Sequence, residues 1–229
     1  MNDPLLLAKA LTKSYAMGAR SLEVLRGVDL DVARGDFLAL RGASGAGKST
    51  LLHLIGGLDS PNSGEILFDG RDIAKFSEAD LTHFRNRRVG FIFQSYHLLP
   101  ELTALENVCL PARIGRVTAA AAESRAVALL EQVGLKERFE HKPFELSGGE
   151  QQRVAIARAL IVGPEMILAD EPTGNLDSRT GLEIIELLKN LSVQTNAALI
   201  IATHDAKVAA AARRVVELAD GRVASAGVE

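Results

Sequence analysis

The sequence has little of several features that would assign it to a common class of protein. It contains one cysteine, Cys109, so no disulfide can form within the chain, and we expect a reducing compartment. Its net charge is −3 and its pI is near 6.0, whereas a nucleic-acid-binding surface normally needs a basic excess. We therefore expect no nucleic-acid partner.

Long hydrophobic runs are also absent. The longest unbroken apolar run is AALIIA, 197–202, whereas a membrane-spanning helix needs roughly 18 or more apolar residues. The N-terminal sequence MNDPLLLAK carries an acid where a signal peptide needs a basic region. We expect a chain without a spanning helix, whose role at any membrane depends on a partner.

The chain does have 229 residues, 47% of them hydrophobic, which is enough for one large domain with a real core. Apolar, β-rich runs followed by helical patterns are typical of βαβ units around a mostly parallel sheet. The three pairs are FLALRG with KSTLLHLIGG, MILADEP with SRTGLEIIELLKNL, and ALIIATHD with AKVAAAARR. Residues 1–41 and 64–70 instead favour short strands, and Asp-Gly pairs at 69–70 and 220–221 predict hairpins. We predict an α/β fold with an antiparallel patch beside the main sheet.

The segment 95–150 lacks a strand signal. Within it, Thr118–Val133 has apolar residues at helical spacing and is followed by Gly134, which is a good C-cap. We predict that 95–150 is a mainly helical insertion, and that 1–94 and 151–229 together form one sheet-containing core.

The loop GASGAGKST, 42–50, matches G-x-x-x-x-G-K-[ST] between a predicted strand and a predicted helix. Glycines let successive backbone N–H groups wrap phosphate oxygens at the positive end of a helix. Lys48 is placed to reach the β- and γ-phosphates, and the Ser49 hydroxyl to bind Mg²⁺. The alternative, an ordinary glycine-rich turn, is disfavoured by the flanking elements. The expected nucleotide contacts are Gly42, Ala43, Ser44, Gly45, Ala46, Gly47, Lys48, Ser49 and Thr50.

A second phosphate-site feature is MILADE, 166–171, an apolar strand that ends in two acids. Because successive strand side chains point to opposite faces, the two carboxylates are not expected to share one role. We assign Asp170 to the metal ion and Glu171 to the water that attacks the phosphate. The alternative is an exposed acidic turn.

Two further polar residues, Gln94 and His204, end the apolar strands VGFIF and ALIIAT. In open α/β sheets, ligands bind at the carboxyl ends of the strands. Each residue taken alone fits a structural role. Together at one edge, the two residues are expected to contact the γ-phosphate and the water or Mg²⁺.

The segment LSGGEQQR, 146–153, places Ser147, Gly148 and Gly149 just before a strongly helical run. This pattern predicts a second anion site at a helix N-terminus. If the chain were an ordinary nucleotide kinase or a small GTPase, this second site would have no explanation.

With this segment, the chain resembles the nucleotide-binding subunits of ABC transporters along essentially its whole length. The matching residues, in chain order, are Tyr15 for adenine stacking, Gly42–Thr50 for Walker A, Gln94 for the Q-loop, Leu146–Glu150 for the signature, Asp170 and Glu171 for Walker B, Asp177 for the D-loop and His204 for the switch histidine. Tyr15 fits side-chain packing as well as stacking.

The resemblance implies a P-loop NTPase (RecA-like) core that binds ATP and Mg²⁺ and hydrolyses the nucleotide. It also implies that two copies pair head to tail, with each ATP between one chain's Walker loop and the other chain's signature. The residues that would contact the partner's nucleotide are Ser147, Gly148, Gly149, Glu150 and Asp177. Lys48, Gln94, Glu171 and His204 would carry the hydrolysis.

The strings STLLHLIGGLD, QSYHLLPELTALENVCLP and DEPTGNLD resemble the lipoprotein-releasing branch of this family, to which macrolide-exporter and cell-division ATPases are close. Glu150 stands where many members have Gln. The resemblance implies two ATPases beneath integral membrane permease subunits (LolC/LolE-like), at the cytoplasmic face of the bacterial inner membrane. The lipoprotein cargo would be contacted only indirectly and would be released toward the outer membrane.

The segment 95–111 is the expected docking surface for the membrane subunits, because Tyr96, Leu98 and Leu99 look exposed and adjoin Gln94. The alternative is that these side chains fill the helical insertion's own core. A competing function is an ABC-type ATPase that transports nothing and regulates cell-wall machinery mechanically. A DNA-repair ATPase of the ABC type is disfavoured. Such proteins resemble this core but carry a long coiled-coil insertion, and the 52 residues between Gln94 and Ser147 leave no room for one.

Overall fold

The computed structural model describes residues 4–18 and 20–228, and the side chains of all of these except 17 and 225–228. The chain divides into two compact units. Unit 1 consists of Met1–Arg85 with Ala198–Glu229, and unit 2 consists of Asn86–Ala197. Each unit is described by itself.

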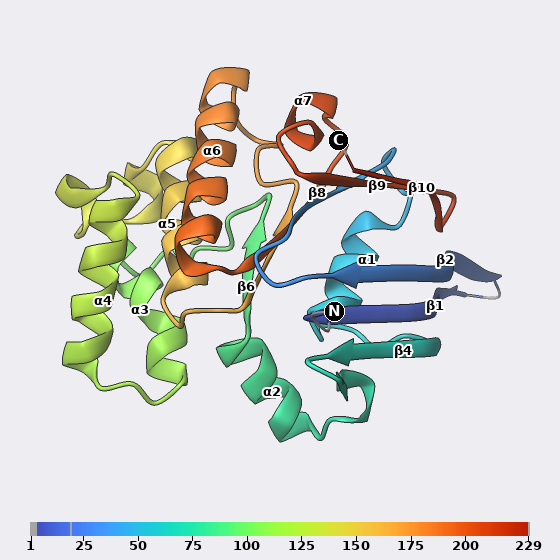
Figure 1. Cartoon of the computed structure of the whole chain (residues 1–229). Helices are drawn as coiled ribbons and strands as arrows, with labels where there is room; N and C mark the ends of the chain where they lie inside the picture. The colour runs from blue at the N-terminus through green and yellow to red at the C-terminus, as the bar shows by residue number, and fades with distance from the viewer. Residues whose placement is uncertain (1–3, 19, 229) are drawn as a thin grey trace. The chain divides into compact units, whose positions relative to one another are not determined.

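Unit 1 contains the predicted antiparallel sheet (Figure 1). Its strands, in spatial order, are β2 (Arg20–Val32), β1 (Leu6–Met17), β4 (Ser63–Phe68) and β5 (Arg71–Asp72). The turn between β4 and β5 is Asp69-Gly70, where both residues have positive φ (52° and 74°), as a tight hairpin requires. This hairpin prediction is confirmed.

Unit 1 also contains a second set of paired strands: β3 (Phe37–Arg41), β8 (Ala198–Thr203), β9 (Arg214–Ala219) and β10 (Arg222–Val228). β3 lies parallel to both β8 and β9, whereas β10 folds back antiparallel onto β9 through Asp220-Gly221. Every residue of β8 is buried, which agrees with its apolar run from Ala198 to Ala202. The second predicted hairpin is therefore also confirmed.

Two helices of unit 1 follow the parallel strands. α1 (Lys48–Ile55) contacts β8 and also β1 and β2, and it buries its leucines between them. α7 is only Ala206–Ala209, shorter than the helical pattern of 206–214 predicts. The chain leaves the helix because the backbone N–H of Arg213 donates to Phe37 in β3, and β9 begins at the next residue. Sheet pairing overrides the alanine-rich helical preference here.

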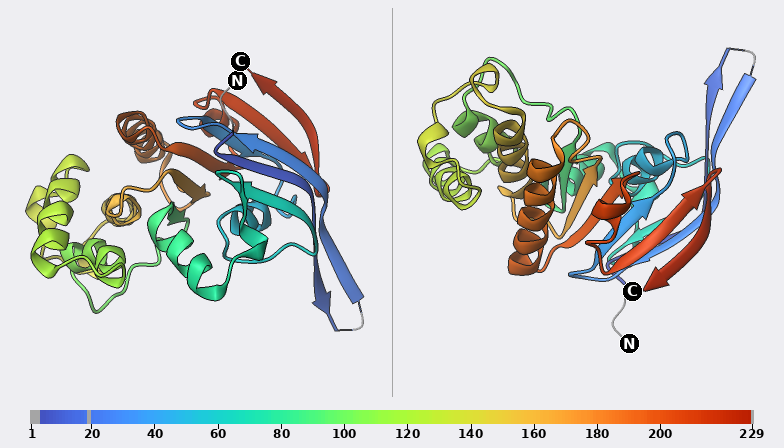
Figure 2. Two further views of the ribbon diagram at one scale, coloured as in Figure 1. Left: turned by 60° about the horizontal axis from the view of Figure 1, so that its bottom comes forward. Right: turned by 90° about the horizontal axis from the view of Figure 1, so that it is seen from above.

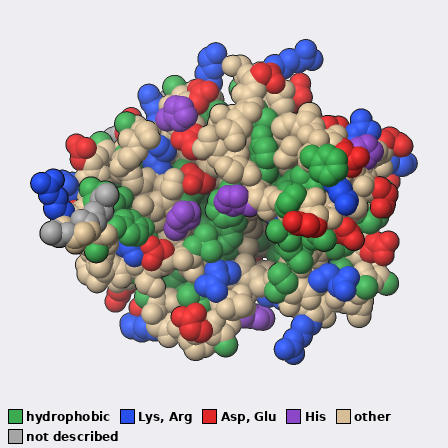
Figure 3. Space-filling view, turned by 180° about the vertical axis from the view of Figure 1, so that it is seen from behind, with side chains coloured by type: hydrophobic (Ala, Val, Ile, Leu, Met, Phe, Trp, Pro, Cys, Tyr) green, Lys and Arg blue, Asp and Glu red, His purple; other side chains and the backbone are tan. Residues whose placement is uncertain are grey.

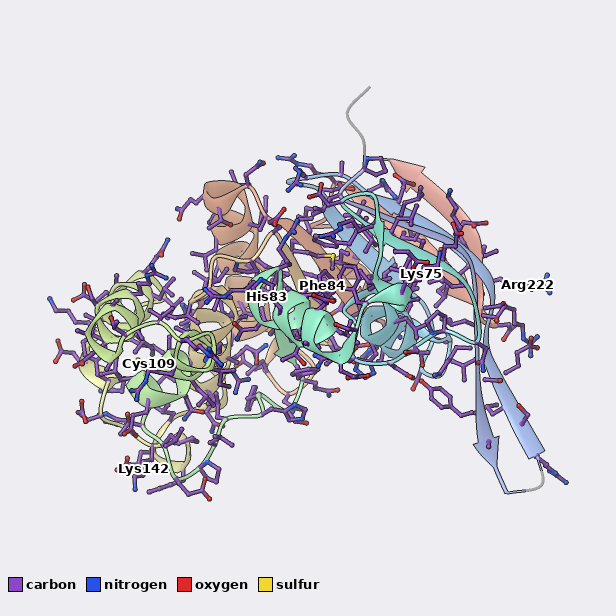
Figure 4. The ribbon with its side chains drawn as sticks, turned by 90° about the horizontal axis from the view of Figure 1, so that it is seen from below. Lys75, His83, Phe84, Cys109, Lys142 and Arg222 are labelled. Carbon is purple, nitrogen blue, oxygen red and sulfur yellow. The ribbon has the colours of Figure 1, made fainter. Side chains whose placement is uncertain are left out.

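The division between the units falls near the end of α2 (Glu78–Arg87). Phe84, labelled in Figure 4, anchors this helix in unit 1. Its ring lies edge-on to Phe68 and Phe76, at centroid distances of 4.9 and 6.1 Å.

Unit 2 contains the parallel pair β6 (Val89–Phe93) and β7 (Met166–Asp170) together with the larger helices. These helices are α3 (Ala104–Ile114), α4 (Ala119–Gln132), α5 (Gly148–Leu160) and α6 (Ser178–Thr195). Figures 1 and 2 show α3 and α4 packed with α5, and α5 also contacts β6 and α6. α4 has Thr118 as its N-cap, and Gly134 follows its end with φ +79°, so the helix predicted over 118–133 is confirmed.

Candidate nucleotide site

The glycine-rich loop of unit 1 connects β3 to α1 and requires its glycines sterically. A Cβ on Gly42 would lie 2.3 Å from the carbonyl oxygen of Leu218, and one on Gly47 would lie 2.7 Å from the Leu25 side chain. Gly47 is the N-cap of α1 and has φ +102°, a conformation that only glycine adopts easily. The loop therefore presents backbone N–H groups at a helix N-terminus without side-chain obstruction, which is the geometry of a phosphate site.

Lys48 is the first residue of α1 and is buried, with 7% of its surface exposed. Its ammonium donates to the carbonyl oxygens of Gly42 and Ala43, at 2.9 and 3.1 Å. The positive charge is thus held against the loop itself, where it can meet a polyphosphate. The adjacent hydroxyl of Ser49 is exposed.

His204 reaches the same edge of the unit 1 sheet as this loop. Arg41, the last residue of β3, pairs with Thr203, the last residue of β8. Gly42 and His204 therefore follow a matched pair of strand ends, and His204 is exposed there. The prediction that His204 lies at a ligand-binding sheet edge agrees with this register.

Tyr15 lies on β1 and is 37% exposed. Its hydroxyl donates to the Asp59 carboxylate at 2.9 Å, and the Lys13 ammonium lies 5.0 Å from its ring centre. Burial and this hydrogen bond raise the pKa of Tyr15. Burial alone would raise the pKa of Asp59, but hydrogen bonds from Lys13, Ser60 and Tyr15 together lower it. The ring is held in place by two charged residues that the sequence analysis did not identify.

The acidic pair of unit 2 differs from the prediction in one respect. β7 is buried from Met166 to Ala169 and ends at Asp170, as expected. Glu171 lies beyond the strand, with φ +45°. Strand alternation therefore does not set the direction of its side chain. The two acids differ in backbone conformation, because Asp170 ends the strand and Glu171 is left-handed. A left-handed backbone is uncommon for a residue other than glycine and is concentrated at functional sites.

Gln94 lies at the same sheet edge as this acidic pair, because Phe93 pairs with Asp170 across β6 and β7. The side-chain amide of Gln94 donates to Asn175 Oδ1 at 3.2 Å, and the Asn175 amide donates to the Gln94 carbonyl at 3.0 Å. The loop after Glu171 is therefore tied to Gln94. The structure thus places Gln94 beside the loop that follows Glu171. It also identifies Asn175 as a contact of Gln94, which the sequence analysis missed.

The signature segment forms the N-terminus of α5, as predicted. Ser147 is the N-cap, and its hydroxyl accepts from the backbone N–H of Glu150. The Glu150 carboxylate accepts in return from the backbone N–H of Ser147, at 2.8 Å, and from its hydroxyl, at 2.9 Å. Arg138 donates to the other Glu150 oxygen at 2.9 Å. The backbone hydrogen bond from Ser147, followed by the contacts with the Ser147 hydroxyl and Arg138, lowers the pKa of Glu150 against the opposing effect of burial.

The two signature glycines are required by close neighbours. A Cβ on Gly148 would lie 2.9 Å from the Tyr96 hydroxyl, and one on Gly149 would lie 2.8 Å from the Thr180 methyl group. The backbone N–H groups of Gly148 and Gly149 belong to the first turn of α5, where no intrahelical acceptor exists. This end of α5 can therefore bind an anion.

Asp177 caps α6. Its carboxylate accepts from the backbone N–H groups of Arg179 and Thr180, both at 3.1 Å. Hydrogen bonding to Thr180 and to Arg179 lowers its pKa. Asp177 is exposed, so a contact with a nucleotide stays a prediction.

The site residues thus form two groups. Unit 1 holds Tyr15, the loop 42–50 and His204, and unit 2 holds Gln94, Ser147–Glu150, Asp170, Glu171 and Asp177.

Within the described part of the chain, no cluster of three His, Cys, Asp or Glu side chains could hold a metal ion by itself. Among the helices of the described residues, none has both the length and the apolar composition that a membrane span requires. On the face in Figure 3, basic and acidic side chains are interspersed.

Comparison with known proteins gives consistent matches. The ABC transporter family model matches residues 25–174. The chain is 54% identical to the lipoprotein-releasing system ATP-binding protein LolD of Syntrophotalea carbinolica over 213 residues, which are 93% of this chain and 94% of that protein. It is 51% identical to the protein of the same name from Legionella pneumophila (strain Paris) over 221 residues, 96% of this chain and 97% of that one.

Solved structures agree with these relatives. A dimeric structure of the ATP-binding cassette MJ0796, in a post-hydrolysis state with ADP and Pi, is 43% identical with a TM-score of 0.90. The match covers 97% of this chain and 98% of that one. The chain cbiO1 from Clostridium perfringens, part of an ABC transporter complex, is 30% identical with a TM-score of 0.88, covering 99% and 89% of the two chains.

Proposed function

We propose a specific role for this chain, which belongs to the ABC transporter family and is the ATP-hydrolysing subunit of such a transporter. The family membership confirms the predicted α/β fold of the P-loop NTPases. Our proposal is that this ATPase drives the release of lipoproteins from the inner membrane toward the outer membrane. The observation that carries it is the identity of 54% with a lipoprotein-releasing ATPase over nearly the full length of both chains.

We assign the nucleotide to the unit 1 loop. Support comes from the Cβ clashes at Gly42 and Gly47 and from the buried ammonium of Lys48. Tyr15, with its ring held by Asp59 and Lys13, would stack on the adenine.

Mg²⁺ fits the oxygen donors of the candidate residues, since this ion prefers oxygen ligands, uses only one or two carboxylates and completes its shell with phosphates and water. Ser49 and Asp170 would bind it, with Gln94 as a further oxygen donor. When bound, Mg²⁺ neutralises the charge that develops on the phosphates.

The reaction is hydrolysis of the γ-phosphate by water. We assign Glu171 to accept the hydrogen bond of the attacking water and to orient it. Gln94, held by Asn175, lies at the same sheet edge, where it can position that water. His204 would contact the γ-phosphate from the end of β8, and Lys48 would stabilise the charge on the leaving group.

The N-terminus of α5 is assigned to the nucleotide of a second copy. The support is an anion site at Ser147–Gly149 in a chain that already has a phosphate loop, together with the dimeric MJ0796 structures. ATP would join the two copies head to tail because its γ-phosphate contacts both. ADP lacks that phosphate, so the equilibrium shifts toward separation after hydrolysis. Glu150 and Asp177 would border the shared nucleotide.

The segment 95–111 is our proposed contact for the LolC/LolE-like permease subunits. Leu99 is 43% exposed, whereas Tyr96 and Leu98 are half-buried. A cavity of about 510 Å³ adjoins this segment and is lined by apolar side chains such as Leu105. Its charged lining residues are three carboxylates and one guanidinium, from Glu106, Glu123, Glu140 and Arg113, so the lining carries a net negative charge. Cys109, labelled in Figure 4, also lines it. A cytoplasmic segment with one apolar anchor and one basic group fits this cavity, and it would hold the ATPase at the inner face of the membrane.

The ATPase activity and the transport role are tested by separate experiments. In the Glu171→Gln variant we expect ATP binding to persist, turnover to fall by about 100-fold or more, and ATP to trap a dimer detectable by light scattering. Glu186→Gln, at an exposed position on α6, is the matched control and should behave as wild type. Unchanged turnover in Glu171→Gln would refute the catalytic assignment.

Cargo is tested with the complex purified from native membranes and reconstituted with a lipoprotein. We expect permease subunits to co-purify and ATP to transfer the lipoprotein to a soluble carrier. Co-purification with cell-wall machinery and no ATP-dependent release would instead support the mechanical regulator.

A further inference from the structure

The chain turns in an unusual way directly after Gln94. Tyr96 and His97 both have left-handed backbones, with φ of +58° and +48°. Residues with a Cβ rarely adopt this conformation, and two in succession are rarer still. Such strain persists only where the surroundings fix it, and it is concentrated at functional sites.

Arg158 supplies the contacts that fix this turn. Its guanidinium donates to the carbonyl of Tyr96 at 2.6 Å and to the carbonyl of His97 at 2.5 Å. A planar guanidinium can serve two adjacent carbonyls at once, which the ammonium of lysine cannot do with the same geometry. Arg158 is half-buried, and this burial lowers its pKa.

The other end of Tyr96 reaches the signature. The Tyr96 hydroxyl lies so close to Gly148 that a Cβ there would be 2.9 Å from it. Gly148 lies in the first turn of α5 and Arg158 in its last turn. The two residues are about 15 Å apart along the helix axis. Long helical side chains point back toward the helix N-terminus. The Arg158 side chain and Tyr96 together therefore run along α5 from its last turn to its first.

We propose that Arg158 is a positioning residue that couples the signature end of α5 to Gln94. This inference rests on the proposed function, because it requires that Ser147–Gly149 bind the partner's ATP. The turn that Arg158 fixes begins two residues after Gln94. The ring centroid of His97 also lies 4.7 Å from that of Phe93, the residue that precedes Gln94. A shift of α5 on phosphate binding is thereby transmitted to the residue that positions the attacking water.

The matched pair of variants is Arg158→Met and Arg153→Met. Both arginines lie on α5 and are half-buried, but Arg153 donates to Val133 and pairs with Glu183, away from the turn. We expect Arg158→Met to lower kcat about tenfold or more while the KM for ATP changes less than about twofold. Arg158→Lys should lose nearly as much, and Arg153→Met should retain the wild-type kcat.

Strain relief distinguishes positioning from simple stability. Glycine adopts the left-handed backbone readily, so His97→Gly should restore part of the kcat that Arg158→Met loses. The protein has no tryptophan and two tyrosines, so in a Tyr15→Phe background the fluorescence of Tyr96 alone reports on the turn. We expect Arg158→Met to increase the quenching of Tyr96 by iodide and Arg153→Met to leave it unchanged.

The outcomes are separable from those of the proposed function. If Glu171→Gln alone fails to form an ATP-dependent dimer, the proposed function is wrong. If that dimer forms but Arg158→Met leaves kcat and Tyr96 quenching as in wild type, the coupling inference alone is overturned. A loss of kcat that merely follows a lower thermal midpoint, without rescue by His97→Gly, also overturns it.

Discussion

The two helix N-termini that we assign to phosphate are built in different ways. At α1 the N-cap is Gly47, which has no side chain to offer, and the cation is the helix's own first residue, Lys48. At α5 the N-cap is Ser147, whose hydroxyl and backbone N–H are both bonded by the carboxylate of Glu150. The first terminus offers backbone N–H groups and a positive charge, whereas the second brings a negative charge that Arg138 balances.

This difference indicates why the two termini should differ in affinity. An anion at α1 meets the helix dipole and a buried ammonium, so one chain suffices to bind it. An anion at α5 must approach past Glu150 and compete for the Ser147 hydroxyl. We therefore expect α5 to bind phosphate weakly by itself and to act only on a nucleotide already held elsewhere, as a second copy would present it.

The largest effect is expected at the first terminus. Lys48→Met removes the cation of the loop, and charge-assisted hydrogen bonds to phosphate are among the strongest that proteins make. We expect the Kd for ATP to rise by about 100-fold or more in isothermal titration calorimetry. Lys189→Met, at a half-buried position on α6 that belongs to none of the candidate site residues, is the control and should leave the Kd unchanged. A small change in Lys48→Met would remove the contrast between the two termini.

A smaller, different effect is expected at the second terminus. Ser147→Ala removes an N-cap and should lower the free energy of unfolding by about 1 kcal/mol. Thr103→Ala is the matched control, because Thr103 caps α3 with the same reciprocal bonding to Glu106. We expect both variants to lose similar stability in urea and to bind ATP as monomers.

Only Ser147→Ala should lose the ATP-dependent dimer when each change is combined with Glu171→Gln. The comparison is made by light scattering at equal protein concentration. Equal dimer formation in both combinations would show that Ser147 is a helix cap and nothing more.

Much of this site follows from sequence because parallel strands end at a common edge. The register pairs Arg41 with Thr203 and Phe93 with Asp170, so polar residues that directly follow these strands must share an edge. Strand length and apolar content alone predict that arrangement. The two hairpins and the cap at Gly134 were likewise predictable, because each depends on a local residue type.

The contacts that hold the site residues in place were not predictable, since their partners lie far away in the sequence. Tyr15 meets Asp59 across 44 positions, and Gln94 meets Asn175 across 81. The left-handed backbone of Glu171 also leaves no trace in a pattern that reads as a continuing strand. Tertiary packing selects these features, and local propensity does not report it.

The smallest expected effect concerns the charge at the second terminus. The folded-state pKa of Glu150 is lowered, so its ionised form stabilises the folded protein at neutral pH. That contribution is present above the ordinary glutamate pKa, about 4.3, and is lost as the pH falls through the lower folded-state value. The wild type should thus be more stable than Glu150→Gln at pH 7, by less than about 1 kcal/mol because the group is partly solvated.

Urea unfolding of both proteins between pH 7 and pH 3 measures this difference, which should shrink toward zero at the acid end. Arg138→Gln should shift the loss to a higher pH, because it removes the guanidinium that helps to hold the Glu150 pKa down. A difference that stays constant with pH would mean that Glu150 stabilises the folded protein by something other than its charge. The second terminus would then resemble the first more closely than its charges indicate, and the weaker phosphate binding that we expect there would lose its electrostatic basis.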